Sequence, residues 1–259
     1  MSDRPIKDDR FWRLIPLIEA SGAEQMAIDS WLLDQHVKGM QPSILRFYTW
    51  LRPTISLGYH QRQFPEHWND LHWQGQRLEL VCRPTGGRAV LHQGDLTYAL
   101  ITSGLSGSRR AVYRQLCQFL IKGWGDLGVA LSFGAAGRGY IHNPNCFGTA
   151  TAADLIMENG YKLIGSAQVY RDGCVLQHGS MRLRPNRDLF EKVFEEKLRP
   201  QSRLPNALLL PDAQNKIMKA LEKAAAQSFD IDFEVRSLTP AEIEDALTHR
   251  PLRLDQRLS

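Results

Sequence analysis

Two dipeptides typical of tight hairpin turns, Asn159-Gly160 and Asp172-Gly173, divide the stretch from residue 154 to residue 184 into three apolar segments. Asparagine or aspartate followed by glycine favours a turn whose twist matches that of two antiparallel strands. The spacing therefore predicts one antiparallel sheet built from consecutive strands near 154–158, 161–170 and 173–184.

The preceding part of the chain alternates helix-like and strand-like patterns. Apolar residues between 23 and 35 fall largely on one face of a helix, and a second amphipathic helix, capped by Ser106 or Ser108, follows the loop at 104–108. Such an order of elements predicts an α+β fold with a mostly antiparallel central sheet flanked by helices. Further elements are predicted as a short helix near 65–72 and strands near 43–50 and 54–59 (joined by a turn at 51–53), 78–83, 88–91, 96–102 and 129–133.

The character of the sequence changes after Pro185. Residues 186–259 are rich in charge, follow largely helical patterns and contain five prolines, at positions 200, 205, 211, 240 and 251. We therefore expect a main domain over 11–185 and a small helical C-terminal subdomain over 186–259.

Composition limits the classes of partner. Hydrophobic residues make up 43% and charged residues 23%, and the net charge of +4 comes from 32 basic and 28 acidic side chains that are spread along the chain. A nucleic-acid partner is not expected, because phosphate binding needs a concentrated basic face. The charged start of the chain and the lack of an apolar run near the roughly 18 residues of a membrane span predict a cytoplasmic protein without a membrane partner.

A pair of glycines stands between two arginines in RPTGGRAVLH, residues 83–92. An ordinary turn between two strands would explain Gly86-Gly87 alone. Glycines also let a ligand approach the backbone, while Arg83 and Arg88 could donate charged hydrogen bonds to a phosphate or carboxyl group. His92 ends the strand that leaves this turn. The segment therefore suits a ligand with an anionic head and an apolar tail, although it lacks the spacing of a P-loop.

A second group of candidate residues lies in KLIGSAQ, residues 162–168. Lys162 opens a predicted strand, and Gly165, Ser166 and Ala167 are three consecutive small residues within it. Small residues inside a strand leave room for a ligand to lie against the backbone. The alternative is a hairpin with a bulge and an ordinary solvated lysine.

The four cysteines have different surroundings. Cys82, Cys117 and Cys174 stand among apolar residues of predicted strands and a helix, so we expect them to be buried. Cys146 follows Asn-Pro-Asn in a loop-like stretch, which is the setting of an accessible nucleophile, with a structural role as the alternative. Because no pair shows CxxC spacing, a metal site is not expected.

RPTGGRAVLH, then GSAQ at 165–168 and LQHGS at 176–180, resemble in this order the motifs of the biotin/lipoate A/B protein ligase family. AEQMAIDSWLL and ILRFYTWLRPTISLGYHQ are similar to that family's opening helix and first hairpin. The resemblance runs from about residue 11 to about residue 185. It implies a domain whose mostly antiparallel sheet surrounds an acyl-binding tunnel.

The family contains lipoate–protein ligases and biotin ligases, which use ATP, and octanoyltransferases, which take octanoate from acyl carrier protein through a cysteinyl thioester. Cys146-Phe147 resembles the cysteine and phenylalanine of ligase-type octanoyltransferases, and the biotin-ligase signature GRGRxGR is absent. The resemblance therefore implies an octanoyltransferase. The segment 148–153 and Tyr161 depart from the family's usual residues, which bears on acyl-chain preference.

The resemblance also implies roles for individual residues. Cys146 would carry the acyl group, and Lys162 would favour its thiolate and hold the carbonyl oxygen. The substrate-binding residues would be Arg83, Gly86, Gly87, Arg88, His92, Gly165, Ser166, Ala167, His178 and Gly179.

The expected donor is octanoyl-acyl carrier protein. The expected acceptor is a lysine of a lipoyl-domain protein, such as glycine cleavage H protein or a 2-oxoacid dehydrogenase E2. Because amide formation from a thioester is downhill, no ATP, other cofactor or metal is expected. The alternatives are an ATP-dependent lipoate–protein ligase that acts through lipoyl-AMP, and a non-enzymatic acyl-binding or carrier-binding protein.

Overall fold

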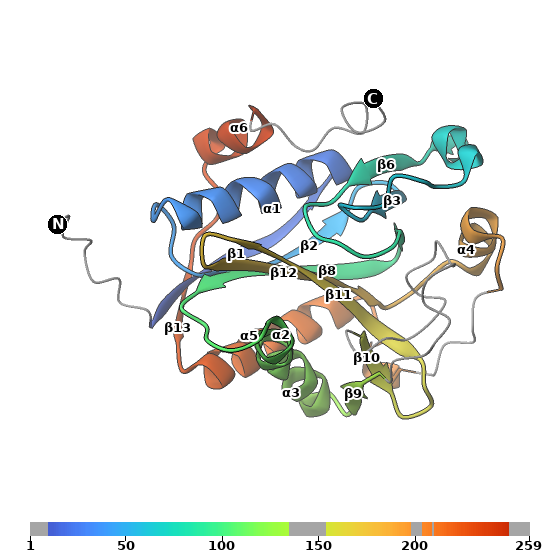
Figure 1. The fold of residues 1–259 in the computed structure, drawn as a ribbon. Helices are drawn as coiled ribbons and strands as arrows, with labels where there is room; N and C mark the ends of the chain where they lie inside the picture. The colour runs from blue at the N-terminus through green and yellow to red at the C-terminus, as the bar shows by residue number, and fades with distance from the viewer. Residues whose placement is uncertain (1–9, 135–153, 198–203, 209, 249–259) are drawn as a thin grey trace.

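A large twisted sheet forms the centre of the molecule in the computed structural model, which describes residues 10–134, 154–197, 204–208 and 210–248 (Figure 1). Its strands lie in the order β13-β1-β2-β8-β12-β11-β10-β9. Parallel pairs join β13 to β1 and β1 to β2, and the other neighbours in this sheet pair antiparallel. The predicted α+β fold with a mostly antiparallel sheet is confirmed. The strands are β1 (Phe11–Ala20), β2 (Ile44–Trp50), β8 (Asp95–Ser103), β9 (Leu131–Phe133), β10 (Asp154–Met157), β11 (Lys162–Arg171), β12 (Cys174–Arg182) and β13 (Asp232–Val235).

The consecutive strands β10, β11 and β12 form the predicted antiparallel run. In the turn between β11 and β12, Asp172 and Gly173 both have positive φ angles, 47° and 79°. Such angles belong to the hairpin turn that aspartate-glycine favours. These local turn residues therefore set the strand order on this side of the sheet.

A second, small sheet lies beside the large one. Its strand pairing differs from the predicted hairpin of strands 43–50 and 54–59. It consists of β6 (Glu79–Cys82), β3 (Thr54–Leu57) and β7 (Val90–His92), with β3 in the middle. The predicted hairpin of β2 and β3 is wrong, because β2 pairs with β1 and β8 instead. Every residue of β3 is buried, as expected for a strand covered on both faces. A two-stranded ribbon of β4 (His72–Trp73) and β5 (Gln76–Arg77) and the short 3₁₀ helix η1 (Glu66–Asp70) lie between β3 and β6 in the chain.

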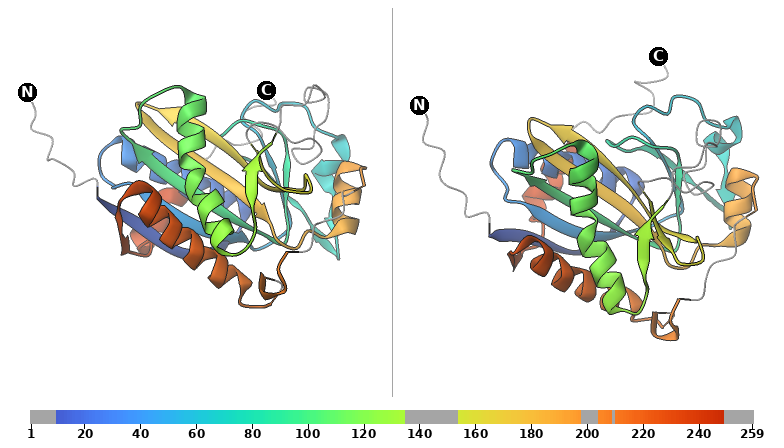
Figure 2. Two further views of the ribbon diagram at one scale, coloured as in Figure 1. Left: turned by 90° about the horizontal axis from the view of Figure 1, so that it is seen from below. Right: turned by 60° about the horizontal axis from the view of Figure 1, so that its bottom comes forward.

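Helices cover both faces of the large sheet (Figure 1). One face carries α1 (Gly22–Val37), which starts with a capping box between Ser21 and Glu24, and α6 (Pro240–Thr248) packs on α1. The other face carries α2 (Arg109–Leu116), α3 (Gln118–Asp126) and α5 (Ala213–Phe229), and Figure 2 shows α3 and α5 running side by side across it. The predicted second amphipathic helix is thus two helices with a turn at Cys117, and Ser108 caps the first of them. No described helix combines the length and the apolar character that crossing a bilayer requires.

Two elements of the region after residue 185, which was predicted as a small helical C-terminal subdomain, share the large sheet and its core. Strand β13 pairs with β1, and Ile217 and Leu221 of α5 are fully buried in the cluster that contains Trp124 of α3. Helix α4 (Arg187–Phe194) packs instead on the small sheet, and a 3₁₀ turn, η2 (Asn206–Leu208), precedes α5.

A buried arginine on β1, which the sequence analysis did not assign to a strand, also ties this region to the sheet. Arg13 is fully buried and donates to both carboxylate oxygens of Glu242 on α6, at 2.7 and 2.9 Å, and to the carbonyl oxygen of Ser237 at 2.6 Å. These hydrogen bonds lower the pKa of Glu242 to about 2. Bidentate pairing of this kind fixes orientation as well as distance.

Removal of core volume from α5 tests whether this region is part of one folding unit. Leu221→Ala is expected to lower the free energy of unfolding of the whole protein by about 2–5 kcal/mol, because a fully buried leucine leaves a cavity. Chemical denaturation followed by circular dichroism measures this. Lys219→Ala, an exposed change on the same helix, is the control. A variant in which α5 melts in a separate, earlier transition would contradict the expectation.

Candidate functional site

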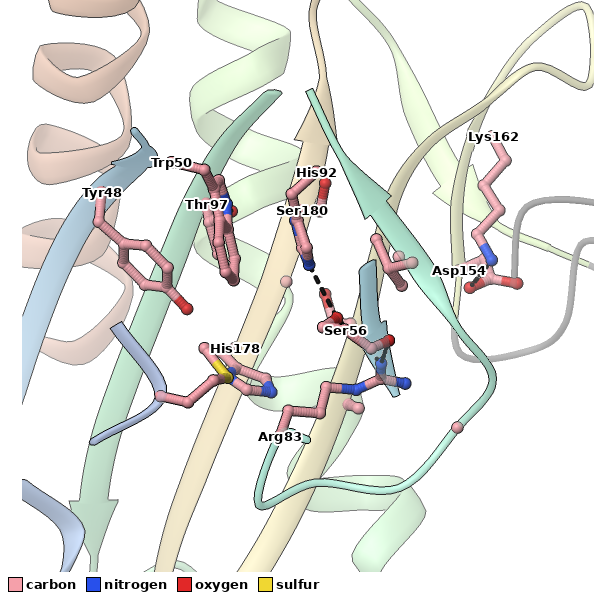
Figure 3. Close-up of a pocket in the computed structure, with 17 residues that line it drawn as sticks. Tyr48, Trp50, Ser56, Arg83, His92, Thr97, Asp154, Lys162, His178 and Ser180 are labelled. Carbon is pink, nitrogen blue, oxygen red and sulfur yellow. Dashed lines mark hydrogen bonds and ion pairs between the residues drawn. The ribbon is translucent and has the colours of Figure 1, made fainter. Parts of the chain in front are cut away.

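A cavity lies between the large sheet and the small sheet and encloses about 600 Å³, with the open space at its mouth included (Figure 3). Strands β2, β8, β11 and β12 contribute one side of it, and the small sheet with the turn after β6 contributes another. Gly86 and Arg88 do not line the cavity, and Cys146 lies outside the described residues. The predicted residues that do line it are Arg83, Gly87, His92, Lys162, Gly165, Ser166, Ala167, His178 and Gly179.

Lys162 is a buried cation in this cavity rather than a solvated lysine. Its Nζ atom lies 2.7 Å from Oδ1 of Asp154 on the neighbouring strand β10, and both side chains are about 95% buried. Figure 3 shows this pair across the cavity from Tyr48 and Trp50. A buried ammonium group needs such a partner to keep its charge. The sequence analysis missed Asp154, whose signal was a carboxylate that opens an otherwise apolar strand.

His92 is part of a hydrogen-bonded chain of three side chains. Its Nδ1 donates to Oδ2 of Asp95 at 2.8 Å, and its Nε2 lies 2.8 Å from the hydroxyl of Ser56. Burial lowers the pKa of His92, and this outweighs the opposing effect of the Asp95 carboxylate. The ring of Trp50 stacks on the imidazole at 3.8 Å between centroids and closes the cavity on that side. His92 is therefore a neutral, enclosed imidazole.

His178 on β12 is the middle of a similar chain. Its Nδ1 donates to Oδ2 of Asp29 on α1 at 2.8 Å, and its Nε2 lies 2.6 Å from the hydroxyl of Thr85. The Asp29 carboxylate also accepts from the Tyr48 hydroxyl at 3.0 Å and faces the guanidinium of Arg46 at 3.4 Å. The resemblance had supplied His178, but nothing in the sequence linked it to Asp29.

Arg83 lines the cavity, and its guanidinium group also contacts the protein backbone. Its guanidinium donates to the carbonyl oxygens of Ser56 at 2.7 Å, Gly86 at 2.9 Å and Arg88 at 2.7 Å. Five N–H groups are available to an arginine, and these contacts direct them at the protein backbone. Arg83 thus holds the turn at 84–88 from inside.

The two glycines of this turn have unequal roles. Gly87 has a φ angle of +95°, and a Cβ atom there would meet Nη2 of Arg83 at 2.8 Å, whereas a Cβ on Gly86 would meet nothing within 4 Å. The turn also packs onto Gly58, where a Cβ would overlap the carbonyl oxygen of Gly87. Gly58 is a position that the sequence analysis did not single out, because only the folded chain brings it against the turn.

The small residues Gly165, Ser166 and Ala167 of β11 pair with Ser180, Gly179 and His178 of β12. The Ser166 hydroxyl bonds to that of Tyr98 at 2.8 Å, and a Cβ atom on Gly179 would overlap the Ser166 hydroxyl oxygen. Glycine at 179 is therefore required by close packing within the sheet. Gly165 and Ala167 leave the cavity surface on this strand free of bulky side chains.

The three described cysteines are buried, as expected: Cys82, Cys117 and Cys174. Burial raises the pKa of the Cys117 thiol to about 12, so this thiol is protonated at neutral pH. None of the three lines the cavity.

Alanine substitution separates the roles of the two glycines. Gly87→Ala is expected to lower the free energy of unfolding by about 1–3 kcal/mol, because its positive φ and the Arg83 guanidinium both oppose a Cβ. Gly86→Ala is the matched control and is expected to change stability by less than about 1 kcal/mol, since no atom stands in its way. Thermal and urea unfolding measure both, and equal losses would contradict the assignment.

The stability of the protein is expected to depend on pH through His92. Its folded-state pKa lies below the unfolded value of 6.5, so the unfolded chain binds more protons at acidic pH. Its contribution is therefore fully present above about pH 6.5 and is lost as the pH falls from there towards the folded-state pKa. Asp95, Arg83 and His178 surround the ring and enter this balance. Urea unfolding at several pH values should show a shallower slope for His92→Gln than for the wild type, and parallel slopes would contradict the expectation.

Comparison with known proteins places the chain in a family. Residues 21–232 match the family described as the lipoyl protein ligase A/B catalytic domain. Octanoyltransferase LipM of Carboxydothermus hydrogenoformans is 34% identical over 240 residues, which cover 91% of this chain and 83% of that protein. Octanoyltransferase LipM of Kyrpidia tusciae is 33% identical over 261 residues, which cover 91% of this chain and 93% of that protein.

Solved structures share the fold. Protein Ta0514 of T. acidophilum with bound lipoic acid has a TM-score of 0.72 at 21% identity, covering 91% of this chain and 92% of that one. Lipoate-protein ligase A bound with ATP has a TM-score of 0.69 at 21% identity, with the same coverage of 91% and 92%. Because the family match spans most of the sequence and the LipM relatives align along nearly all of it, this chain belongs to the lipoyl protein ligase A/B catalytic-domain family.

Proposed function

We propose that this chain is an acyltransferase that moves an octanoyl group from acyl carrier protein to a lysine of a lipoyl domain, in protein lipoylation. The observation that carries this proposal is the identity of 33–34% to octanoyltransferases LipM along nearly the whole chain. The cavity supports it, since a buried ammonium group and small strand residues face the same enclosed space.

Cys146 is the proposed nucleophile. Its thiolate attacks the carbonyl carbon of the donor thioester, the bond from that carbon to the donor sulfur breaks, and the donor leaves as a thiol after taking a proton. Cys146 precedes Asp154, the first residue of β10 and the partner of Lys162.

Lys162 is the proposed electrostatic partner in both steps. Its ammonium group stabilises the negative charge that develops on the carbonyl oxygen. Asp154 holds that ammonium group in place. The carboxylate therefore compensates part of the positive charge of Lys162 before substrate binds. Lys162 therefore acts chiefly by position, as a hydrogen-bond donor held at a fixed point of the cavity wall.

Transfer to the acceptor completes the reaction. The neutral amine of the acceptor lysine attacks the acyl-cysteine, a C–N bond forms, the C–S bond breaks, and the amine proton passes to the released thiolate. The product is an amide, which is more stable than a thioester, so the step needs no ATP. The acceptors proposed are glycine cleavage H protein or the lipoyl domain of a 2-oxoacid dehydrogenase E2.

Intact mass spectrometry tests the proposal. The wild type incubated with octanoyl-acyl carrier protein is expected to gain one octanoyl group, and Cys146→Ala is expected to gain none, because no other cysteine that the structure describes lines the cavity. Cys174→Ala, which removes a buried thiol elsewhere, is the control and should retain the adduct.

Two outcomes would count against this assignment. An octanoyl adduct that persists in Cys146→Ala would remove the cysteine from the mechanism. A wild type that forms no adduct but catalyses ATP–pyrophosphate exchange only when lipoate is present would indicate a lipoate–protein ligase instead.

A further inference from the structure

Two chains of hydrogen-bonded side chains end on the same short turn, residues 83–88, which we call the glycine loop. One chain comes from Asp95 and the other from Asp29, and each passes through a histidine and a hydroxyl group. We propose that the two chains position the glycine loop over the cavity, so that Asp29, Ser56, Thr85 and Asp95 are positioning residues for acyl transfer. The inference rests on the proposed function for the reaction that the loop serves.

The first chain has a defined direction. Oδ2 of Asp95 accepts hydrogen bonds from the Ser180 hydroxyl at 2.6 Å and from His92 Nδ1 at 2.8 Å. A carboxylate only accepts, so the ring proton of His92 sits on Nδ1, and Nε2 accepts the proton of the Ser56 hydroxyl. The Ser56 oxygen then accepts from Nη1 of Arg83 at 3.2 Å. The negative charge of Asp95 is thereby linked, bond by bond, to the positive charge of Arg83.

The second chain follows the same rule from the opposite side. Asp29 accepts a hydrogen bond from Nδ1 of His178 at 2.8 Å, and Nε2 of the same ring is hydrogen-bonded to the Thr85 hydroxyl at 2.6 Å. Thr85 belongs to the glycine loop itself, and its carbonyl oxygen accepts from the backbone N–H of Tyr59 at 2.8 Å. The loop is therefore held through Arg83 at its beginning and through Thr85 near its middle.

The arrangement of Ser56, His92 and Asp95 has the connectivity of a Ser-His-Asp nucleophile triad, but its surroundings do not fit that role. Ser56 lines the cavity, but it is fully buried and its hydroxyl group is held between Nε2 of His92 at 2.8 Å and Nη1 of Arg83 at 3.2 Å. A nucleophile must reach the reacting carbonyl carbon. Both ring nitrogens of His92 are engaged by protein groups, as are those of His178. Each histidine therefore works as a rigid spacer between a buried carboxylate and the loop.

Positioning of this loop matters because Gly87 lines the cavity and packs on Gly58 without a gap. A displacement of about 1 Å at a reacting centre lowers the rate of an enzymatic reaction by about a hundredfold. The two chains hold the loop through Ser56, His92 and His178, which themselves line the cavity.

Removal of single hydroxyl groups tests the inference. Thr85→Val keeps the shape of the side chain but breaks the bond to His178, and Ser56→Ala breaks the link between His92 and Arg83. Thr85→Ser retains the hydroxyl and is the rescue variant. Thr102→Val is the matched control, since it removes a buried hydroxyl that bonds to Ser43 on the same large sheet, away from the loop.

Hydrogen exchange in the free protein is the first measurement. Thr85→Val and Ser56→Ala are each expected to speed exchange of the Tyr59 and Arg83 amides about tenfold relative to wild type, because these amides donate across the loop and its base. Thr85→Ser should exchange like wild type, and Thr102→Val should leave these amides unchanged. Equal exchange rates of the Tyr59 and Arg83 amides in Thr85→Val and Thr102→Val would overturn the inference.

Steady-state kinetics of octanoyl transfer is the second measurement. Thr85→Val is expected to lower kcat/KM at least about tenfold, Thr85→Ser to restore it, and Thr102→Val to leave it near wild type despite a similar loss of stability. A loosened loop with unchanged kcat/KM would overturn the positioning role. The exchange experiment needs no substrate, and the octanoyl adduct on the wild type tests the proposed function alone, so the two proposals fail on different results.

Discussion

The buried carboxylates of Asp29 and Asp95 are the charges on which the cavity depends. A carboxylate removed from water must be matched by hydrogen-bond donors, and each of these two binds the Nδ1 of a histidine. The other ring nitrogen of each histidine is hydrogen-bonded to a hydroxyl group. These bonds connect both carboxylates to the glycine loop, because the Thr85 hydroxyl belongs to that loop and the Ser56 hydroxyl contacts Arg83.

Charge in the cavity is thus used in two different ways. On one side, the carboxylates of Asp29 and Asp95 are hydrogen-bonded through histidines and hydroxyl groups to the turn at 83–88. On the other side, Lys162 and Asp154 place a paired cation at the cavity surface, where the proposed reaction would use it to stabilise charge on the carbonyl oxygen.

Local chemistry explains which parts of the fold were predictable. The hairpins around Gly160 and Asp172-Gly173 depend on the φ angles of a few adjacent residues, so the strand order β10-β11-β12 followed from the sequence. The pairing of β3 did not, because its partners β6 and β7 are chosen by burial on both faces rather than by the short turn that precedes it. The packing of α5 into the main core was likewise not predictable. It depends on contacts with α3, a helix that lies more than 80 residues away in the sequence.

The candidate site divides in the same way. Residue types and their order within RPTGGRAVLH, KLIGSAQ and LQHGS were enough to indicate the family and about half of the cavity lining, because glycine, lysine and histidine at those positions carry chemistry that few other residues share. Asp29 and Gly58 could not be recognised, since in these positions a carboxylate or a glycine becomes informative only through what it touches. Tertiary structure alone decided which backbone carbonyl oxygens Arg83 contacts, because Ser56 on β3 and the turn at 84–88 come together only when the small sheet forms.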